Sequence, residues 1–209
     1  MQQAQSEAVS GAAQPSRRAT AEAFLDAAER LLVEVGHAGI STRRLAAEAG
    51  ANQGLVHYYF GSIDELFVQV LERFTERLVA RQHEMYAADR PFIEKWRAAW
   101  RFQEEDLDAG YSKIWMELQA LSWSHPELRP RVARVNAEWR GVLREAFARA
   151  AEEYRLSGDE FPVEALVAMT MTVGQGYALE RLEGIDEGHR ELLDWIERWL
   201  ESLDERRTA

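Results

Sequence analysis

Residues 41–60 read STRRLAAEAGANQGLVHYYF, and this stretch decides the fold. Apolar residues repeat three and four positions apart in both halves of it, as they do on one face of a helix. Between the halves, Gly50 tolerates the positive φ that ends many helices, and Asn52 is a good cap for a second helix. Two short helices joined by a glycine-containing turn form the helix-turn-helix pattern, whose second helix lies in the DNA major groove. The stretch therefore predicts DNA binding, with an ordinary hairpin of two helices as the alternative.

Polar side chains at the second short helix are candidates for reading DNA bases. Gln53 and His57 are four residues apart, so they share one helix face, and both carry donors and acceptors. Gly54 leaves room for the backbone to approach DNA closely. At the start of the first short helix, Thr42 and Arg43 can reach the DNA backbone, and Arg43 can also reach a guanine. The candidates for phosphate contacts are Arg44, Tyr58 and Tyr59. For the two tyrosines, a position facing the core is the alternative.

This segment closely resembles the DNA-binding signature of TetR-type transcriptional regulators. The resemblance covers about residues 17–70 and rests on the run from Thr42 to Phe60 and on Asp64, Glu65 and Leu66. Members of the family are homodimeric, all-helical bacterial repressors that small ligands release from DNA. The resemblance therefore implies a homodimer, a palindromic double-stranded DNA operator and a small-molecule effector, without a cofactor. It also implies DNA contacts by Thr42, Arg43, Gln53, Gly54, His57, Tyr58 and Tyr59.

Two positions depart from the family pattern. His57 stands where the family usually has tyrosine, so we expect a changed base preference. Ile63 stands where a lysine commonly meets a phosphate. Its presence removes one expected phosphate contact and should weaken the salt-dependent part of DNA affinity.

The composition is that of a soluble globular protein. The chain has 209 residues, of which 46% are hydrophobic and 29% charged, and it contains no cysteine. It has no apolar run long enough to span a membrane and no signal-peptide pattern, so we expect a cytoplasmic protein without membrane contact. The net charge of −11 predicts weak non-specific DNA binding. A local basic face is still expected from arginines at two helix starts: Arg17, Arg18, Arg43 and Arg44.

Hydrophobic periodicity predicts an all-α fold of about nine helices. We expect a disordered tail over residues 1–16, a three-helix helix-turn-helix DNA-binding domain over 17–64, and a helical ligand-binding and dimerisation domain over 65–209. Pro130 leaves two possibilities for the seventh helix. Either a short turn precedes a helix that starts near Pro130, or a longer helix is kinked there.

The middle of the chain is rich in tryptophan, with polar residues about one turn away. A helical bundle that encloses an apolar cavity with a few polar groups is the usual form of a ligand pocket. We predict a pocket for a small aromatic or lipophilic molecule, lined by Trp96, Trp100, Gln103, Trp115, Gln119, Trp123, Asn136 and Trp139. A cation held by tryptophan faces and by Glu104 or Asp106 is a second possibility. For each of these residues, plain core packing is the alternative.

The last two helices are predicted to form a dimer interface. Gly174 and Gly176 would each weaken an isolated helix by about 1 kcal/mol, so close packing is the plausible reason for them. The final helix is apolar over more of its circumference than one buried face needs, and two helices from each subunit would bury the surplus. The predicted interface residues are Leu166, Met169, Thr170, Val173, Gly174, Tyr177, Trp195, Ile196 and Trp199. Alternatively, Trp195 and Trp199 cover the core of their own protomer.

The sequence offers no constellation that favours catalysis, and we expect no enzyme, metal or cofactor. The carboxylates of residues 104–106 are adjacent in sequence, so on a helix they point in different directions and make a poor metal site. The five histidines lack the spacing of metal ligands. The predicted function is a ligand-responsive homodimeric DNA-binding regulator, specifically a repressor. The alternatives are a helical small-molecule-binding protein without operator binding, and an activator or ligand-independent regulator.

Overall fold

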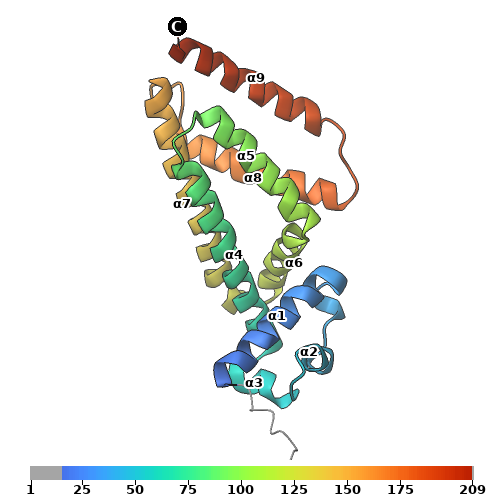
Figure 1. Cartoon of the computed structure of the whole chain (residues 1–209). Coiled ribbons are helices and arrows are strands. Elements are labelled where there is room, and N and C mark those ends of the chain that lie inside the picture. Colours follow the sequence, from blue (N-terminus) through green and yellow to red (C-terminus); the bar gives the residue numbers. More distant parts are fainter. Residues whose placement is uncertain (1–15, 209) are drawn as a thin grey trace, which may run out of the picture.

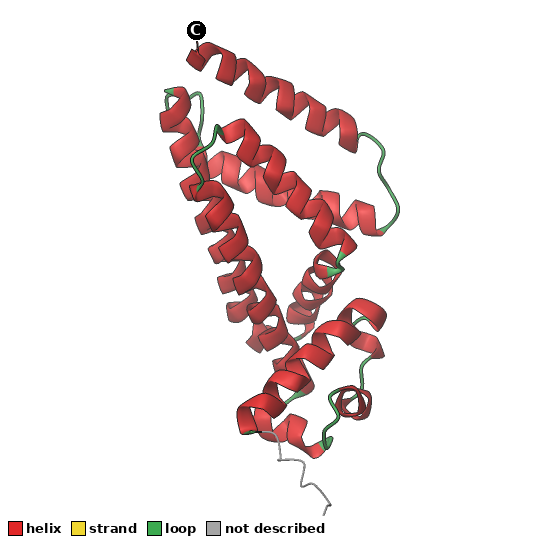
Figure 2. Cartoon of the chain, in the orientation of Figure 1, coloured by secondary structure: helices red, strands yellow, loops and turns green. Residues whose placement is uncertain are grey.

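The structure is a computed structural model that describes residues 16–208. The tail predicted over residues 1–16 thus lies, apart from Ser16, outside the described residues. The described part consists of α-helices and short 3-10 turns without a strand, which confirms the all-α prediction (Figures 1 and 2). The helices are α1 Arg17–Val35, α2 Thr42–Glu48, α3 Gly54–Phe60, α4 Ile63–Ala87, α5 Phe92–Asp108, α6 Tyr111–Ser124, α7 Arg129–Tyr154, α8 Val163–Leu182 and α9 His189–Thr208.

Serines begin three of the N-terminal helices. In each case the hydroxyl accepts a hydrogen bond from a backbone N–H three residues further on: Ser16 before α1, Ser41 before α2 and Ser62 before α4. Serine is favoured at this position because the first N–H groups of a helix have no partner within it.

Pro130 lies in the first turn of α7, where its missing N–H costs no hydrogen bond of the helix. A short 3-10 turn, Pro126–Leu128, leads into this helix. Of the two possibilities for this region, the short turn followed by a new helix is therefore correct.

The molecule is elongated. Figure 1 shows α1, α2 and α3 gathered at one end and α9 at the other. The helices α4 and α7 run side by side between the two ends. Consequently α4 connects the helix-turn-helix end directly to the larger helical part.

The hydrophobic core has two parts. The first part joins the inner faces of α1–α3 to the first half of α4, and it continues into α6 and α7 through residues such as Ile114 and Val132. The second part lies between α5, the second half of α7, α8 and α9, and includes Phe147 and Phe161. The helix-turn-helix segment therefore shares its core with the base of the larger domain.

Arginines of α7 hold α4 through two glutamates. Arg131 donates hydrogen bonds to Glu65 and Glu72, and Arg134 donates to Glu72 as well. The hydrogen bonds from Arg131 are the largest cause that holds the pKa of Glu72 below its ordinary value, and partial burial opposes them. A lowered pKa in the folded state means that the carboxylate stabilises the fold above its unfolded pKa near 4.5. This stabilisation is lost as the pH falls through the lowered value.

Replacing Glu72 by glutamine should lower the free energy of unfolding by about 1–2 kcal/mol at neutral pH, because Arg134 loses its carboxylate partner and Arg131 keeps only Glu65. Urea unfolding at about pH 7 and about pH 3.5 should show the difference shrinking at the lower pH. The matched control is Glu76→Gln, one turn further along α4 and exposed, which should change stability by less than about 0.5 kcal/mol. An equal loss at both pH values would contradict the role of the carboxylate charge.

Candidate functional site

The turn between α2 and α3 has the geometry that the sequence predicts. Gly50 has a φ of +62°, which a glycine adopts without strain. The Asn52 side chain accepts a hydrogen bond of 2.8 Å from the backbone N–H of Gly54, so it caps the start of α3. Val56 and Phe60 are buried and hold α3 against the core. The opposite face of α3 is left open to solvent.

Most of the predicted DNA-contact residues lie on exposed surface of α2 and α3. Arg43, Arg44, Gln53, Gly54, His57 and Tyr58 are exposed, whereas Thr42 and Tyr59 are half-buried. Gln53 at the start of α3 and His57 one turn later are both exposed and available to base edges.

His57 also has a local role. Its Nδ1 lies 2.8 Å from the backbone oxygen of Gly61 at the end of α3. A carbonyl oxygen only accepts, so Nδ1 carries the proton. In the neutral ring Nε2 is then an acceptor, and it faces away from this bond. The side chain is thereby oriented by the helix end before any partner arrives.

The two tyrosines of α3 differ in their surroundings. Tyr58 is 59% exposed, and the guanidinium of Arg17 lies 4.7 Å from the centre of its ring. Tyr59 packs instead against Phe24 and Phe60 in the first core. Tyr58 is therefore the freer of the two for a phosphate contact, and Tyr59 is in large part a core residue.

Acidic and basic side chains are distributed unevenly at the N-terminal end. Arg73 of α4 donates hydrogen bonds to Glu22, Asp26 and Glu29 of α1. Arg73 thus offsets part of the negative charge of these three carboxylates on the side of α1 that faces α4. Within residues 16–208, no acidic side chain pairs with any of the four arginines at the starts of α1 and α2: Arg17, Arg18, Arg43 and Arg44. These arginines remain available for phosphates.

Ile63, at the first position of α4, packs against the first core. Ile63 thus makes an apolar contact with the core, whereas a lysine at this position would offer a positive charge.

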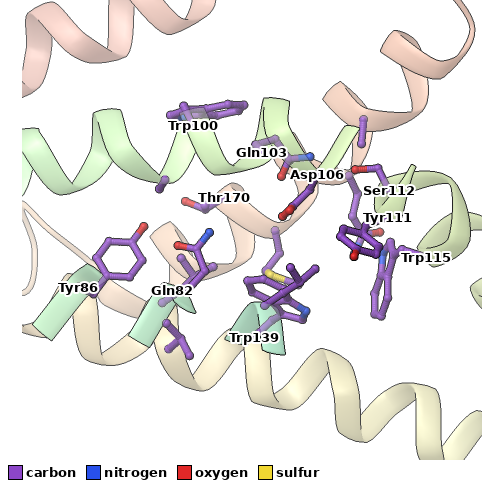
Figure 3. Close-up of a pocket in the computed structure, with 18 of the residues that line it drawn as sticks. Gln82, Tyr86, Trp100, Gln103, Asp106, Tyr111, Ser112, Trp115, Trp139 and Thr170 are labelled. Carbon is purple, nitrogen blue, oxygen red and sulfur yellow. The ribbon is translucent and has the colours of Figure 1, made fainter. Parts of the chain in front are cut away.

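A cavity of about 170 Å³ lies in the larger domain between α4, α5, α6, α7 and α8 (Figure 3). A single water molecule needs only about 15 Å³ of such space, so the cavity admits a small organic molecule. Its lining is mainly apolar. Of the predicted residues, it is lined by Trp96, Trp100, Gln103, Trp115 and Trp139.

The other three predicted ligand residues do not line this cavity. Gln119 and Asn136 are half-buried elsewhere. Trp123, in the last turn of α6, is 70% exposed. We therefore omit these three from the proposed ligand site.

Several lining residues were not among the predicted ligand residues: Gln82, Tyr86, Tyr111, Ser112, Thr170 and Gln175. One of them left a signal in the sequence. Gln82 follows Leu78 by four positions and precedes Met85 by three, so it is a polar residue in the apolar stripe of α4. A polar residue within an apolar stripe indicates a buried polar site.

The carboxylates near the cavity are already engaged. Both oxygens of Asp106 accept hydrogen bonds from Nη2 of Arg81, at 2.7 and 2.8 Å. Burial is the largest cause of the raised pKa of Asp106, and Arg81 opposes it. Glu104 accepts a hydrogen bond from the Tyr177 hydroxyl and another from Arg181 at 3.3 Å. Burial and the bond to Glu104 raise the pKa of Tyr177 to about 12, so the phenol stays protonated and donates at neutral pH.

The predicted interface residues fall into three groups. Met169, Trp195 and Trp199 are exposed on α8 and α9, although Trp199 also stacks on Phe161 at 6.0 Å. Thr170 and Gly174 line the cavity. The residues that are buried or half-buried within the protomer are Leu166, Val173, Tyr177 and Ile196.

Helix α6 connects the cavity to the helix-turn-helix end. Tyr111, Ser112 and Trp115 of α6 line the cavity. From the same helix, Lys113 donates a hydrogen bond of 3.0 Å to the backbone oxygen of Val33 in α1. A carboxylate oxygen of Glu117 accepts a hydrogen bond of 2.6 Å from the backbone N–H of His37, just after α1. Helix α6 therefore contacts both the cavity and the end of α1.

The described residues contain no group of three or more acidic, histidine or cysteine side chains that could hold a metal ion. Within residues 16–208, each helix is too short or too polar to cross a membrane.

Residues 24–70 match the family described as bacterial regulatory proteins of the tetR family. The transcriptional repressor Rv3405c of Mycobacterium tuberculosis is 38% identical over 73 residues, which are 35% of this chain and 39% of that repressor. The chain thus matches well under half the length of this curated relative. The nucleoid occlusion factor SlmA of Vibrio vulnificus is 26% identical over 174 residues, which are 80% of this chain and 83% of SlmA.

Solved structures show the same fold along most of the chain. The fatty acid degradation regulator FadR of Bacillus halodurans has a TM-score of 0.70 at 16% identity, with 90% of this chain and 96% of FadR covered. At this identity the likeness concerns the fold alone. Residues 24–70 thus carry the helix-turn-helix segment of the TetR family of bacterial regulatory proteins, and the chain has the same fold as FadR along most of its length.

Proposed function

We propose that the protein is a homodimeric repressor that a small aromatic or lipophilic molecule releases from a palindromic DNA operator. The observation that carries the ligand response is the double role of α6, which lines the cavity with one set of residues and holds α1 with Lys113 and Glu117. A ligand that fits better in one arrangement of α6 shifts the population towards that arrangement. The spacing of the two α3 helices in a dimer then no longer matches adjacent major grooves.

DNA contacts are assigned to exposed residues of α2 and α3 and to the half-buried Thr42 and Tyr59. Gln53, His57 and Arg43 are proposed to read bases, and Thr42, Arg44, Tyr58 and Tyr59 to contact the DNA backbone, with Gly54 allowing close approach. Phosphate contacts position a protein on DNA, whereas base contacts select the sequence.

Dimerisation is proposed through the exposed faces of α8 and α9. Most of the large hydrophobic side chains that are exposed in the described part of the chain lie on these two helices or in the loop between them: Met169, Leu179, Leu182, Ile185, Trp195 and Trp199. A second copy of the chain would cover this surface by pairing two helices from each subunit. Gly176, which is exposed on α8, has no neighbouring atom within 4 Å of an added Cβ in the protomer, so a second helix could approach closely there.

The function is tested by binding of the purified protein to DNA from around its own gene, with random-sequence competitor and a salt series. A protected palindrome would support a regulator, and loss of the complex on addition of ligand would support the repressor mechanism. Absence of binding beyond competitor at low salt would favour a small-molecule-binding protein without an operator, consistent with Ile63 at the start of α4.

Replacing Gln53 by alanine should weaken specific operator binding by about 1–3 kcal/mol, because a base contact is lost. Fluorescence anisotropy with labelled operator and with random DNA measures both affinities. The comparison variant Arg44→Ala should weaken binding to both DNAs and lower the salt slope by about 1. Equal losses of Gln53→Ala on operator and random DNA would remove Gln53 from the base-reading residues.

A further inference from the structure

The polar side chains that face the cavity are nearly all uncharged. Asp106 is the one carboxylate among the lining residues, and both of its oxygens are held by Arg81. Glu104, the other acid near the aromatic wall, is occupied by Tyr177 and Arg181. A cationic ligand would therefore meet no free carboxylate, and an anionic ligand no free cation. Either one would lose its hydration without a new partner.

Two polar atoms of the cavity wall lack a hydrogen bond. The side-chain oxygen of Gln82 on α4 and the hydroxyl of Thr170 on α8 are both buried without a partner. Only 8% of Gln82 is exposed, and Figure 3 shows its amide pointing from α4 into the cavity. A buried polar group without a partner is costly, so such groups are rare unless something else satisfies them.

We propose that the effector is an uncharged aromatic molecule whose hydroxyl or amide group is bound by Gln82 and Thr170. The inference rests on the proposal that this cavity is the effector site. A glutamine amide offers a donor and an acceptor, and a threonine hydroxyl can rotate to serve as either. The complementary group therefore both donates and accepts. The aromatic part of the ligand lies among Trp96, Trp100 and Trp139, which supply rings for stacking and edge contacts.

The two polar residues also lie on different helices. A ligand bound to both would bridge α4, which leads to the helix-turn-helix end, and α8, which carries part of the proposed dimer surface. The polar group would then set the position of α4 relative to α8, while the rings supply most of the buried area.

The test uses four naphthalene derivatives that differ in one substituent. They are 2-naphthol, 2-methylnaphthalene, 2-naphthoate and 2-naphthylmethylammonium, and calorimetric titration of the full chain at neutral pH measures the affinity of each. We expect 2-naphthol to bind about tenfold more tightly than 2-methylnaphthalene, because its hydroxyl satisfies the two free groups. The anion and the cation should bind at least about tenfold more weakly than 2-naphthol.

Two variants connect this preference to the residues. Gln82→Leu and Thr170→Val each remove the polar group at similar size. Each should lower the affinity ratio of 2-naphthol to 2-methylnaphthalene at least about threefold, and together they should bring it near one. The control Gln119→Leu makes the same change at a half-buried glutamine outside the cavity and should leave the ratio unchanged.

Stability of the unliganded variants separates recognition from folding. Because the Gln82 oxygen has no partner, Gln82→Leu should melt at the same or a higher temperature than the parent protein. A lower melting temperature would mean that Gln82 has a structural partner and would overturn the proposal. Tightest binding of the cation, an unchanged ratio in both variants, or no binding of any of the four compounds would overturn it as well.

These titrations contain no DNA, so they test the proposed ligand chemistry independently of the proposed repressor mechanism. Selective binding of 2-naphthol without release of the operator supports the recognition pair and contradicts the ligand response. Operator binding without selective uptake of 2-naphthol contradicts the recognition pair alone.

Discussion

Substituting Trp195 by glutamate should convert the proposed dimer into a monomer and lower affinity for the proposed operator by at least about a hundredfold. Trp195 on α9 is 62% exposed in the protomer, so the change should be tolerated by the protomer fold. In the proposed dimer the carboxylate would be buried without a partner, which costs about 3–5 kcal/mol. A monomer also loses the second half-site. Sedimentation analysis gives the mass in solution, and anisotropy titration gives the affinity.

Trp123 provides the matched control for this substitution. It is 70% exposed in the last turn of α6, a helix outside the proposed dimer surface. Trp123→Glu should therefore leave both the dimer and the operator affinity unchanged. If Trp195→Glu still sedimented as a dimer, the interface would have to lie elsewhere than on this face of α9.

Replacing Gly36 by alanine should lower the free energy of unfolding by about 3 kcal/mol. Gly36 lies between α1 and the following turn with φ 71° and ψ 167°, a backbone conformation that is essentially restricted to glycine. An added Cβ would lie 2.5 Å from an oxygen of Glu117. The Glu117 side chain would have to move away, and its hydrogen bond to the backbone of His37 would break. Urea unfolding measures the loss.

A glycine inside a helix gives the opposite expectation. Gly141 in α7 has nothing within 4 Å of an added Cβ and a negative φ. Gly141→Ala should be neutral or stabilise the protein by up to about 1 kcal/mol, because alanine is the better helix former. A loss for Gly36→Ala no larger than for Gly141→Ala would show that neither the backbone conformation of Gly36 nor the Glu117 contact matters to stability.

Local sequence signals were sufficient for the helix-turn-helix segment. Gly50 and Asn52 act through the backbone within a few residues, so their roles follow from the chain itself. The same holds for the serines that begin α1, α2 and α4.

The ligand cavity could be predicted only in part, because helical spacing shows which residues share a face but not what that face packs against. Trp115 and Trp123 both lie on α6, yet one lines the cavity and the other is exposed. Thr170, which helical spacing places among the predicted interface residues, also lines the cavity. The partners of Asp106 and Glu104 are 25 and more residues away in sequence, so spacing gave no indication of them.

The shared first core has a consequence for how this chain can be divided. Phe24 and Leu45 of the helix-turn-helix segment belong to the same buried cluster as Leu66, Ile114 and Leu118. A fragment cut after residue 64 would keep the side chains proposed to contact DNA but expose the apolar surface that those later residues cover. We therefore expect that α1, α2 and α3 cannot fold on their own when excised or grafted onto another protein. They should melt together with the base of the larger helical domain.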